Sequence, residues 1–333
     1  MAKKKTKNIV VIGGGTGTYT VLKGLKDHDV NLTAVVSMMD SGGSNRILRD
    51  EFGLLPTSDI RQCIVALADE DTKNDDLRKL FTYRYESGTG ISGMTFGNLF
   101  MAALTDIYGS QKVAIKKTCE LLHVKGEILP VTYDNSHLVA RYDNGKQVLG
   151  EHFIDEPEEE IAKHKIIELE LLPKASVNRE VVSVINNADL IVIGPGDLFT
   201  SIICNLIVDG VVNAIKDSKA KCVYVMNLMT KYGETTDYTA NDHLRTLENY
   251  LGKGTLDFCL VNSSKSFPRG IISKYKEERA KPVKNDLKND HFKVVRRSMV
   301  GNKVYQRGKS DLVKRSLIRH DPKKLAKALL SLL

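Results

Sequence analysis

Long apolar runs are missing from this sequence. A membrane-spanning helix needs roughly 18 consecutive apolar residues, and no segment of the 333-residue chain approaches that length. The basic N-terminal residues lead into a short apolar stretch, NIVVIG at 8–13, that ends in glycines. Such a stretch is typical of a buried first strand and not of a signal peptide. The sequence therefore predicts no insertion into a membrane.

Cysteine is also scarce, and its spacing excludes the usual cysteine chemistries. The five cysteines are odd in number, widely separated and mostly set within apolar segments: Cys63, Cys119, Cys204, Cys222 and Cys259. No pair has the spacing of a zinc site or of a redox-active motif. We expect free thiols that fill the core of a protein located in the reducing cytoplasm.

Aromatic residues make up only 6% of the chain, and few of them lie among its basic residues. The formal net charge is +8, but residues 265–333 hold 20 Lys and Arg against 6 Asp and Glu. A basic segment of this kind can bind nucleic acid or an anionic ligand. Without interleaved aromatics or a recognition motif, a solvated basic face is favoured over a nucleic-acid surface. We expect the segment to pack onto the rest of the chain, because apolar residues recur in it at strand or helix spacing: Val294, Val295, Leu325, Leu329 and Leu332.

The order of apolar segments predicts an α/β fold. A strand at 8–13, a helical stretch and a second strand at 32–39 form one βαβ unit. Parallel order returns with apolar strands at 188–194, 221–227 and 257–263, which are separated by helical segments. Strands that are apolar throughout are typical of a sheet covered on both faces.

Two excursions interrupt this parallel order. In four segments the apolar residues recur every three or four positions, which predicts an inserted layer of helices: DIRQCIVALAD, DDLRKLFTYRY, GNLFMAALTDIY and VAIKKTCELLH. Three later segments are either apolar throughout or alternate apolar with polar residues: GEILPVTY, HLVARYDNGKQVLGEHFI and KIIELELL. They predict a small antiparallel unit with a hairpin turn at Asp143-Asn144-Gly145. KVVRRSMV and PKKLAKALLSLL are expected to add a last edge strand and a closing helix.

The chain contains no repeats, no low-complexity tract and no clear linker. Residues 1–333 are therefore predicted to form one elaborated, doubly wound domain. In such a fold the ligand binds where loops leave the carboxyl ends of the parallel strands.

The first loop at that edge is Gly13-Gly14-Gly15-Thr16-Gly17. Glycines permit a tight turn and let backbone N–H groups approach a phosphate at a helix N-terminus. The spacing departs from G-x-G-x-x-G, so a purely structural turn is the alternative interpretation.

The second loop, Asp40-Ser41-Gly42-Gly43-Ser44-Asn45, follows the second strand. Asp40 could hold a ribose, as in a dehydrogenase, but a second glycine pair with hydroxyl groups favours a different nucleotide site. An Asx turn that starts a helix is the structural alternative. Two interpretations are open for the segment further on. In one, Ser58 or Asp59 caps a helix. In the other, Asp59 turns toward Asp40 so that the two carboxylates hold a metal ion or a reacting hydroxyl group. Arg61 suits either a phosphate or a surface ion pair.

The third and fourth loops follow the later strands. Gly194-Pro195-Gly196-Asp197-Leu198-Phe199-Thr200-Ser201 combines two glycines with hydroxyl groups at a helix start, which suits an anion. Asn227-Leu228-Met229-Thr230 continues into a loop that could bracket a base or a sugar. Thr239 and Asp242 fit a capping box, so the neighbouring His243 is expected to be structural.

Taken in order, these segments resemble the YvcK/CofD family of Rossmann-like proteins: GGGTG, MMDSGGS, LPTSDIRQCIVALAD, GNLFMAAL, ADLIVIGPGDLFTSIICNL and NLMTKYGETTDYTANDH. The resemblance runs from Lys7 to the closing RHDPKKLAKALLSLL. It implies a Rossmann-like, three-layer αβα fold with a mainly parallel sheet. Together, the loops and the resemblance predict a nucleotide-ligand site at Gly13, Gly14, Gly15, Thr16, Gly17, Gly42, Gly43, Ser44, Arg61, Asn98, Gly194, Gly196, Thr200, Ser201, Asn227 and Thr230.

The resemblance also implies a choice between two functions. The YvcK branch, to which this sequence looks closer, contains gluconeogenesis factors that bind UDP-sugars and support cell shape during growth on gluconeogenic carbon sources. The CofD branch contains magnesium-dependent 2-phospho-L-lactate transferases, which pass a phospholactyl group from a guanylyl donor to a deazaflavin. Asp40 and Asp59 match its acidic residues and would be catalytic and bind magnesium in such an enzyme. UDP-sugar binding is the leading hypothesis, the transferase is the alternative, and an NAD-linked oxidoreductase is a third.

Some positions depart from the pattern of the YvcK branch. Ser41 stands where a second Asp is common, and Arg46-Ile47 replaces a Gly-Arg pair. Met94 occupies the place of a common His, and Asp197 that of a Ser. These changes alter one anion-binding loop and add negative charge beside another. The sequence leaves open whether the protein forms a homo-oligomer.

Overall fold

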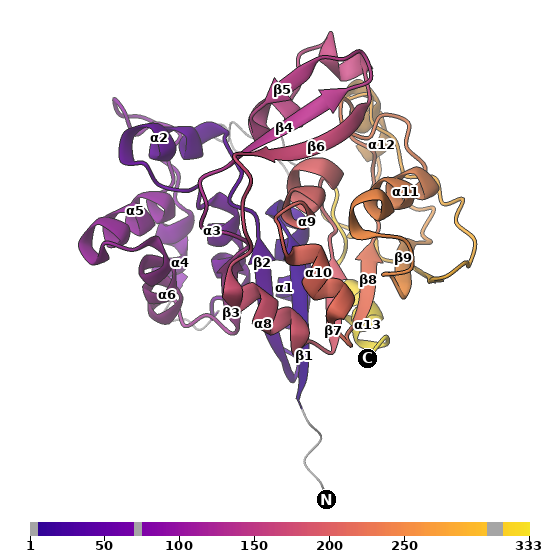
Figure 1. Cartoon of the computed structure of the whole chain (residues 1–333), viewed down its shortest axis with the longest axis horizontal. Coiled ribbons are helices and arrows are strands. Elements are labelled where there is room, and N and C mark those ends of the chain that lie inside the picture. Colours follow the sequence, from indigo (N-terminus) through magenta and orange to yellow (C-terminus); the bar gives the residue numbers. More distant parts are fainter. Residues whose placement is uncertain (1–5, 70–74, 305–315) are drawn as a thin grey trace, which may run out of the picture.

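The computed structural model describes residues 6–69, 75–304 and 316–333. Its centre is a parallel seven-stranded sheet with the order β10-β9-β8-β7-β1-β2-β3 (Figure 1). The strands are β1 (Lys7–Gly13), β2 (Val30–Val36), β3 (Glu127–Pro130), β7 (Leu190–Ile193), β8 (Lys221–Val225), β9 (Phe258–Asn262) and β10 (Lys293–Arg297). The predicted α/β fold is confirmed, as is the last edge strand.

The strand order reverses between β1 and β7. The chain adds β2 and β3 on one side of β1, and it adds β8, β9 and β10 on the far side of β7. Ile12 of β1 pairs with Val35 of β2 and with Ile193 of β7, so the loops after β1 and β7 begin side by side. In open α/β sheets, a crevice for ligands forms at this kind of reversal.

The small antiparallel sheet is confirmed, but its predicted extent is wrong at one end. It has the order β5-β4-β6, formed by β4 (His137–Tyr142), β5 (Gln147–Leu149) and β6 (Ile166–Leu172). GEILPVTY was expected in this unit, whereas its residues 127–130 form β3 and pair in parallel with β2. The reason is its burial: Ile128, Leu129 and Pro130 are all buried, as in a strand covered on both faces.

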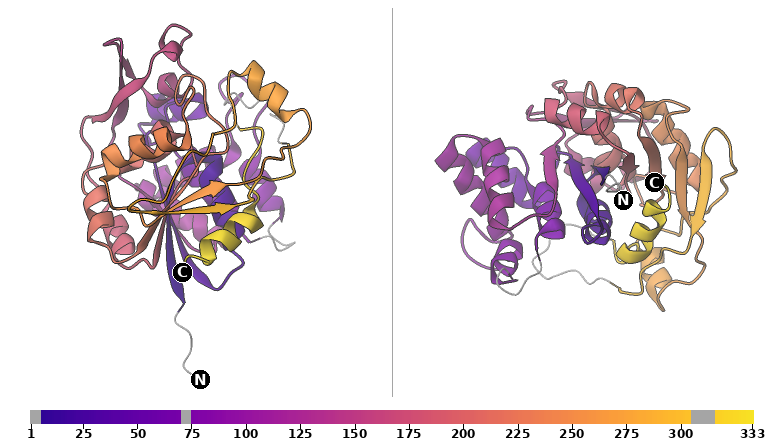
Figure 2. Two further views of the ribbon diagram at one scale, coloured as in Figure 1. Left: turned by 90° about the vertical axis from the view of Figure 1, so that its right-hand side faces the viewer. Right: turned by 90° about the horizontal axis from the view of Figure 1, so that it is seen from below.

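Helices cover both faces of the main sheet, because successive residues of a strand point to opposite sides. Ile9 and Val11 of β1 pack toward a layer formed by α1 (Gly15–Leu25), α3 (Ser58–Leu67) and α13 (Pro322–Leu330). Val10 and Ile12 pack toward the opposite layer. That layer contains α8 (Arg179–Asn186), the wide-turn helix η2 (Leu198–Ile203), α9 (Cys204–Leu206), α10 (Val211–Asp217) and α11 (Ala240–Leu251). Figure 2 shows α13 in yellow on one side of the sheet and α10 and α11 on the other.

The predicted inserted helices are present between β2 and β3. They are α2 (Gly43–Phe52), α3, α4 (Asp75–Thr82), α5 (Phe96–Tyr108) and α6 (Gln111–Leu121). In Figure 1 α2, α4, α5 and α6 lie together beyond the β3 edge of the sheet. Between β5 and β6 the chain forms α7 (Glu151–Asp155) and the short helix η1 (Ile161–Lys163).

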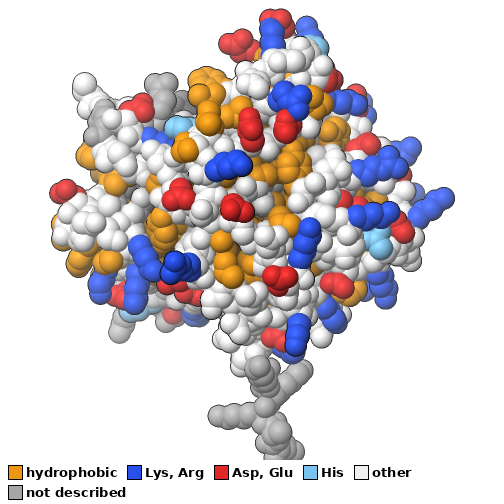
Figure 3. Space-filling model, in the orientation of Figure 1, with side chains coloured by type: hydrophobic (Ala, Val, Ile, Leu, Met, Phe, Trp, Pro, Cys, Tyr) orange, Lys and Arg blue, Asp and Glu red, His pale blue; other side chains and the backbone are white. Residues whose placement is uncertain are grey.

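The described parts of the basic segment, residues 265–304 and 316–333, pack onto the rest of the chain, as predicted, and residues 305–315 lie outside the described residues. Asp321 caps α13 by accepting a hydrogen bond from Lys324 N–H, and Pro322 occupies the first turn. Gly24 of α1 allows the two helices to approach closely, because a Cβ there would lie 2.2 Å from Pro322 O. Another helix of this region, α12 (Ile271–Glu277), precedes β10. On the face shown in Figure 3, Lys and Arg side chains are interspersed with Asp and Glu. No helix in the described parts of the chain is both long and apolar enough to span a bilayer.

Candidate functional site

A cleft of about 1110 Å³ lies at the carboxyl ends of the parallel strands, with residues of β5 and α7 on one side. It brings together predicted site residues from all four loops: Gly14, Gly15, Thr16, Gly17, Asp40, Gly42, Asp59, Gly196, Thr200, Ser201, Asn227 and Thr230. Gly13, Gly194, Arg61 and Asn98 do not belong to this lining. Gly43 and Ser44 form the start of α2, and the side chains of Ser44 and Arg46 fall outside the described part of the structure.

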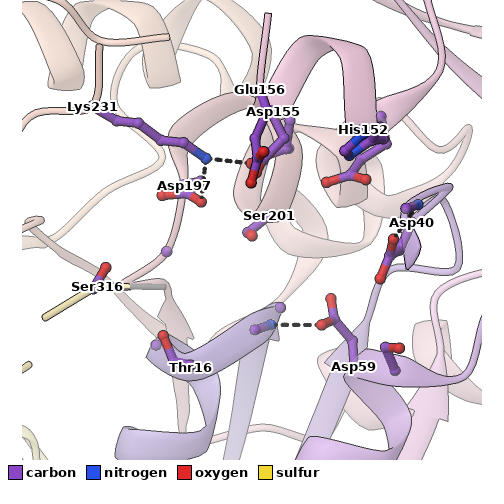
Figure 4. Close-up of a pocket in the computed structure, with 18 of the residues that line it drawn as sticks. Thr16, Asp40, Asp59, His152, Asp155, Glu156, Asp197, Ser201, Lys231 and Ser316 are labelled. Atoms are coloured by element: carbon purple, nitrogen blue, oxygen red, sulfur yellow. Dashed lines mark hydrogen bonds and ion pairs between the residues drawn. The ribbon is translucent and has the colours of Figure 1, made fainter. Parts of the chain in front are cut away.

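The first glycine loop is held by Asp59. The Asp59 carboxylate reaches from α3 to the N-terminus of α1, where Oδ1 accepts a 2.9 Å hydrogen bond from Gly15 N–H (Figure 4). A Cβ at Gly14 would lie 2.3 Å from Asp59 Oδ2, so the carboxylate requires a glycine there. The expectation that Ser58 or Asp59 caps α3 is wrong, because Thr57 holds the N-cap position. Asp59 instead stabilises the partial positive charge at the N-terminus of α1.

Asp40 forms an Asx turn at the start of α2. Its Oδ1 accepts a 2.9 Å hydrogen bond from Gly42 N–H, and its Oδ2 accepts one from the Asn45 side-chain amide. The structural alternative for this loop is therefore present, although Asp40 also lines the cleft. Burial raises the pKa of Asp40 above its usual value, and the nearby Asp155 carboxylate raises it further.

The third and fourth loops are tied to each other. Gly196 N–H donates to Asn227 Oδ1 at 3.2 Å, and the N–H groups of Phe199 and Thr200 donate to Glu234 Oε1 at 2.7 and 3.2 Å. The loops after β7 and β8 therefore form one wall of the cleft. A carboxylate of the chain again occupies the N-terminus of a helix, here η2.

Arg61 and Asn98 lie together away from this lining. Arg61 Nε donates to Asn98 Oδ1 at 3.1 Å, and both side chains are buried. Arg61 contributes to a separate cavity of about 110 Å³. The contact joins α3 to α5, and a phosphate-binding role for either residue stays a prediction. Met94, where a His was expected, is buried in an apolar cluster with Leu48 and Ala102.

The sequence reasoning missed several charged residues in or beside the cleft, and four of them determine much of its electrostatics. Glu151 and Asp155 lie on α7, whereas Lys231 and Glu234 follow β8. The first two belong to the acidic run EHFIDEPEEE, which matches no motif. The other two lie within the NLMTKYGETT loop. The spacing of a basic and an acidic residue three positions apart in that loop could have indicated an ion pair.

Carboxylates dominate the electrostatics of the cleft. Burial raises the pKa of Glu151 well above its usual range, and the carboxylates of Asp40 and Asp155 add to the effect. Burial also raises the pKa of Asp197 and that of Glu234, the latter to about 8. Desolvation is the first cause of each of these shifts, and neighbouring carboxyl groups add to it. The cleft therefore concentrates acidic side chains.

Lys231 supplies one positive charge. Burial lowers the pKa of its ammonium, but Asp155, Asp197 and Glu234 outweigh that effect and hold the pKa well above its ordinary value. One oxygen from each of these three carboxyl groups lies within 4.8 Å of the others, so the group could hold a metal ion. The Lys231 ammonium already lies among them, 2.9 Å from Asp197 Oδ2. Asp40 and Asp59 are not members of this group, and their binding of magnesium stays a prediction.

Substituting Glu234 by glutamine is expected to flatten the pH dependence of stability. In the folded protein the pKa of Glu234 is about 8, above its ordinary value of 4.5. Its contribution to stability is therefore complete below the unfolded-state pKa and is lost as the pH rises through the folded-state pKa, at no more than about 1.4 kcal/mol per pH unit. Urea unfolding from about pH 6 to about pH 9 measures this slope.

Between these pH values the parent should lose stability faster than Glu234→Gln, whose amide oxygen can still accept the hydrogen bonds at the start of η2. Glu170→Gln, at an exposed position of β6, is the matched control and should follow the parent. Parallel curves for all three proteins would show that Glu234 does not titrate in this range.

The fold and the cleft define a doubly wound α/β protein with a polar cleft at its topological switch point. A sequence model of the family described as 2-phospho-L-lactate transferase CofD matches residues 9–300. The gluconeogenesis factor of Bacillus subtilis (strain 168) is 37% identical over 325 residues, covering 98% of both chains. That of Halalkalibacterium halodurans is 40% identical over 280 residues, covering 84% of both. A crystal structure of a UPF0052 family member from Bacillus halodurans superposes with a TM-score of 0.87 at 36% identity, covering 98% of this chain and 99% of the other. The chain belongs to the CofD family and, within it, to the group of gluconeogenesis factors.

Proposed function

We propose that the protein binds a nucleotide sugar, specifically a UDP-sugar, in the cleft together with a divalent cation. The observation that carries the proposal is the convergence of both glycine loops, Thr16, Thr200 and Ser201 on one cavity of about 1110 Å³ at the switch point. Cavities of this size enclose nucleotide-sized ligands. The hydroxyl groups suit a diphosphate and a sugar, and the cation offsets the carboxylates that face the ligand.

The biological role that follows is regulatory. Two relatives of similar length carry the name gluconeogenesis factor, so the cleft would sense a nucleotide sugar, in the cytoplasm, and support cell shape during gluconeogenic growth.

A magnesium-dependent transfer of a phospholactyl group to a deazaflavin is the second candidate function. The match to the family described as 2-phospho-L-lactate transferase supports it, and so does the raised pKa of Asp40, because a carboxylate of higher pKa is a better general base. An NAD-linked oxidoreductase is less well supported, since Asp40 already serves as the acceptor of an Asx turn.

A thermal-shift panel of UDP-sugars, GDP, GTP, NAD and a deazaflavin separates these functions. A ligand present at about 100 times its dissociation constant adds about 2.7 kcal/mol to the stability of the folded state. Stabilisation by UDP-sugars alone would support the proposal. Stabilisation by guanine nucleotides and the deazaflavin would favour the transferase, and stabilisation by NAD would favour the oxidoreductase.

Replacing Gly14 or Gly196 by valine is expected to weaken UDP-sugar binding by about tenfold or more. The valine side chain would place an isopropyl group in the cleft, where it would keep the ligand from the backbone. A Cβ at Gly196 would lie 3.1 Å from Ser201 Cβ, and one at Gly14 would displace the Asp59 carboxylate. Calorimetric titration of both variants measures the loss. Ser183→Val, on an exposed position of α8, is the control and should bind like the parent. Equal affinities in all four proteins would remove both loops from the site.

A further inference from the structure

Lys231 lies where three separate segments of the chain meet. Asp155 comes from the end of α7, Asp197 from the loop after β7, and Glu234 from the turn that follows Lys231 itself. Figure 4 shows the lysine side chain extending toward Asp155 and Asp197 at one side of the cavity. The ammonium therefore joins the small-sheet segment to two loops of the main sheet.

The three carboxyl groups are arranged as ligands of a single cation. Their nearest oxygens all lie within 4.8 Å of one another. Two oxygens on opposite sides of one divalent ion are separated by roughly 4 to 5 Å, since each metal–oxygen bond is about 2.0 to 2.6 Å long. The Lys231 ammonium occupies the space between them: it bonds to Asp155 Oδ1 and lies 2.9 Å from Asp197 Oδ2.

Glu234 gives independent evidence that this space suits a cation other than the ammonium. Its side chain is fully buried, and Oε1 is fixed by the N–H groups of Phe199 and Thr200. Oε2 is buried with no hydrogen-bond partner among the described residues. The ammonium is 3.6 Å away, which is too long for a hydrogen bond. A buried carboxyl oxygen without a partner is costly, and this carboxyl group lies beside the two aspartates.

We propose that Asp155, Asp197 and Glu234 form a latent divalent-cation site that Lys231 fills from within the chain. The ammonium satisfies two of the three carboxylates by hydrogen bonds, whereas a metal ion at the same place would also bind Glu234 Oε2. A divalent ion can enter only by displacing the ammonium and its charge-assisted hydrogen bonds. Lys231 thus controls whether a divalent ion can enter this end of the cleft, and the inference does not depend on which nucleotide the protein binds.

The parent protein therefore carries a permanent positive charge here, independent of the metal concentration. The Lys231 side chain keeps 23% of its surface exposed and contributes to the cleft lining. Any magnesium that accompanies the ligand would bind elsewhere, on the side of Asp40. The two ends of the cleft are then neutralised in different ways, one by a lysine and the other by an ion.

The test is manganese binding to Lys231→Gln and to the parent by calorimetric titration without nucleotide. In Lys231→Gln the metal does not have to break the charge-assisted hydrogen bonds of the ammonium. The dissociation constant of manganese from this variant should therefore be about tenfold or more below that from the parent. Lys231→Arg keeps the positive charge and should show no gain. The double variant Lys231→Gln with Glu234→Gln should lose the gain, whereas Lys231→Gln with Asp40→Asn should keep it.

Loss of the ammonium leaves carboxylates buried without a counter-charge, which destabilises the fold. Thermal unfolding of Lys231→Gln with and without manganese therefore accompanies the titration, and manganese should stabilise this variant much more than it stabilises the parent. A second variant, Lys231→Gln with Asp197→Ser, carries one negative charge fewer in this group, should fold more readily and should bind manganese more weakly than the single variant. Equal manganese affinity and equal thermal shifts in the parent, in Lys231→Gln and in Lys231→Gln with Asp197→Ser would overturn the proposal. A gain in manganese affinity that survives in Lys231→Gln with Glu234→Gln would overturn it as well.

Discussion

Replacing Gly17 by alanine is expected to lower the free energy of unfolding by about 3 kcal/mol or more, or to prevent folding. A Cβ at this position would lie 1.8 Å from the carbonyl oxygen of Pro195 and 2.5 Å from its carbonyl carbon. Both are backbone atoms of the loop that leaves β7, and β7 lies between β1 and β8 in the sheet. Neither loop can move away without disturbing the central strands. Urea unfolding of the variant measures the loss.

Gly42→Ala is the matched control, because it adds the same methyl group to another glycine of the cleft. The nearest atom to its Cβ would be Nδ1 of the His152 side chain, at 3.2 Å, and a side chain can shift at little cost. Its unfolding curve should stay close to that of the parent. If Gly17→Ala were equally stable, the loops after β1 and β7 would not be in backbone contact. Gly17 therefore has a structural role whether or not it also touches a ligand.

Removal of magnesium is expected to weaken UDP-sugar binding by at least about 100-fold. The reason is repulsion between the diphosphate and negative side chains. A carboxylate about 7 Å from a phosphate charge costs roughly 2 kcal/mol at an effective dielectric constant near 20. The like charges are carboxylates of the cleft lining: Asp40, Asp155 and Asp197. Lys231 and the lining residues Arg49, Arg84 and Arg319 offset part of this charge. Calorimetric titration of a UDP-sugar in magnesium and in a chelator measures the difference.

Asp40→Asn and Asp59→Asn should each reduce the benefit of magnesium while scarcely changing stability, since asparagine keeps the shape and one acceptor oxygen. The effect should be smaller for Asp59, whose Oδ1 already accepts a hydrogen bond from Gly15 N–H. Ser183→Val serves again as the control remote from the cleft. Identical affinities with and without magnesium in the parent and both variants would leave these residues with structural roles only, and would also remove the magnesium-dependent transferase as a candidate.

The sequence predicted most of the parallel strands well because most of them are apolar runs bounded by turn residues. The Thr239 capping box also follows from local spacing, and it is present: Thr239 Oγ1 accepts a hydrogen bond from Asp242 N–H, while the Asp242 carboxylate accepts one from Thr239 N–H. His243 is buried and bonds to Thr239 O, as expected for a structural residue. The strand at 127–130 was placed in the wrong sheet because a four-residue apolar run does not show which partner it will join.

The electrostatic part of the site could not be predicted in the same way. Asp155 and Lys231 are 76 positions apart in the chain, and Asp59 is 44 positions from Gly15. No local pattern links such residues; only the folded chain brings them together. The alternative in which Asp59 turns toward Asp40 rests on the expected convergence of loops at one sheet edge, whereas its bond to the Gly15 N–H group depends on how α3 packs against α1.

If the proposed function is right, Asp59 at the start of α1 gives ligand capture the character of an anion exchange. A phosphate that took over the N–H group of Gly15 would release the Asp59 carboxylate that is bound there. The free energy gained would be the difference between two interactions of the same kind, so it would be smaller than that of either alone. When the ligand left, the carboxylate would return and the Gly15 donor would keep a partner. The first glycine loop would then keep its hydrogen-bonded shape through each cycle of binding and release.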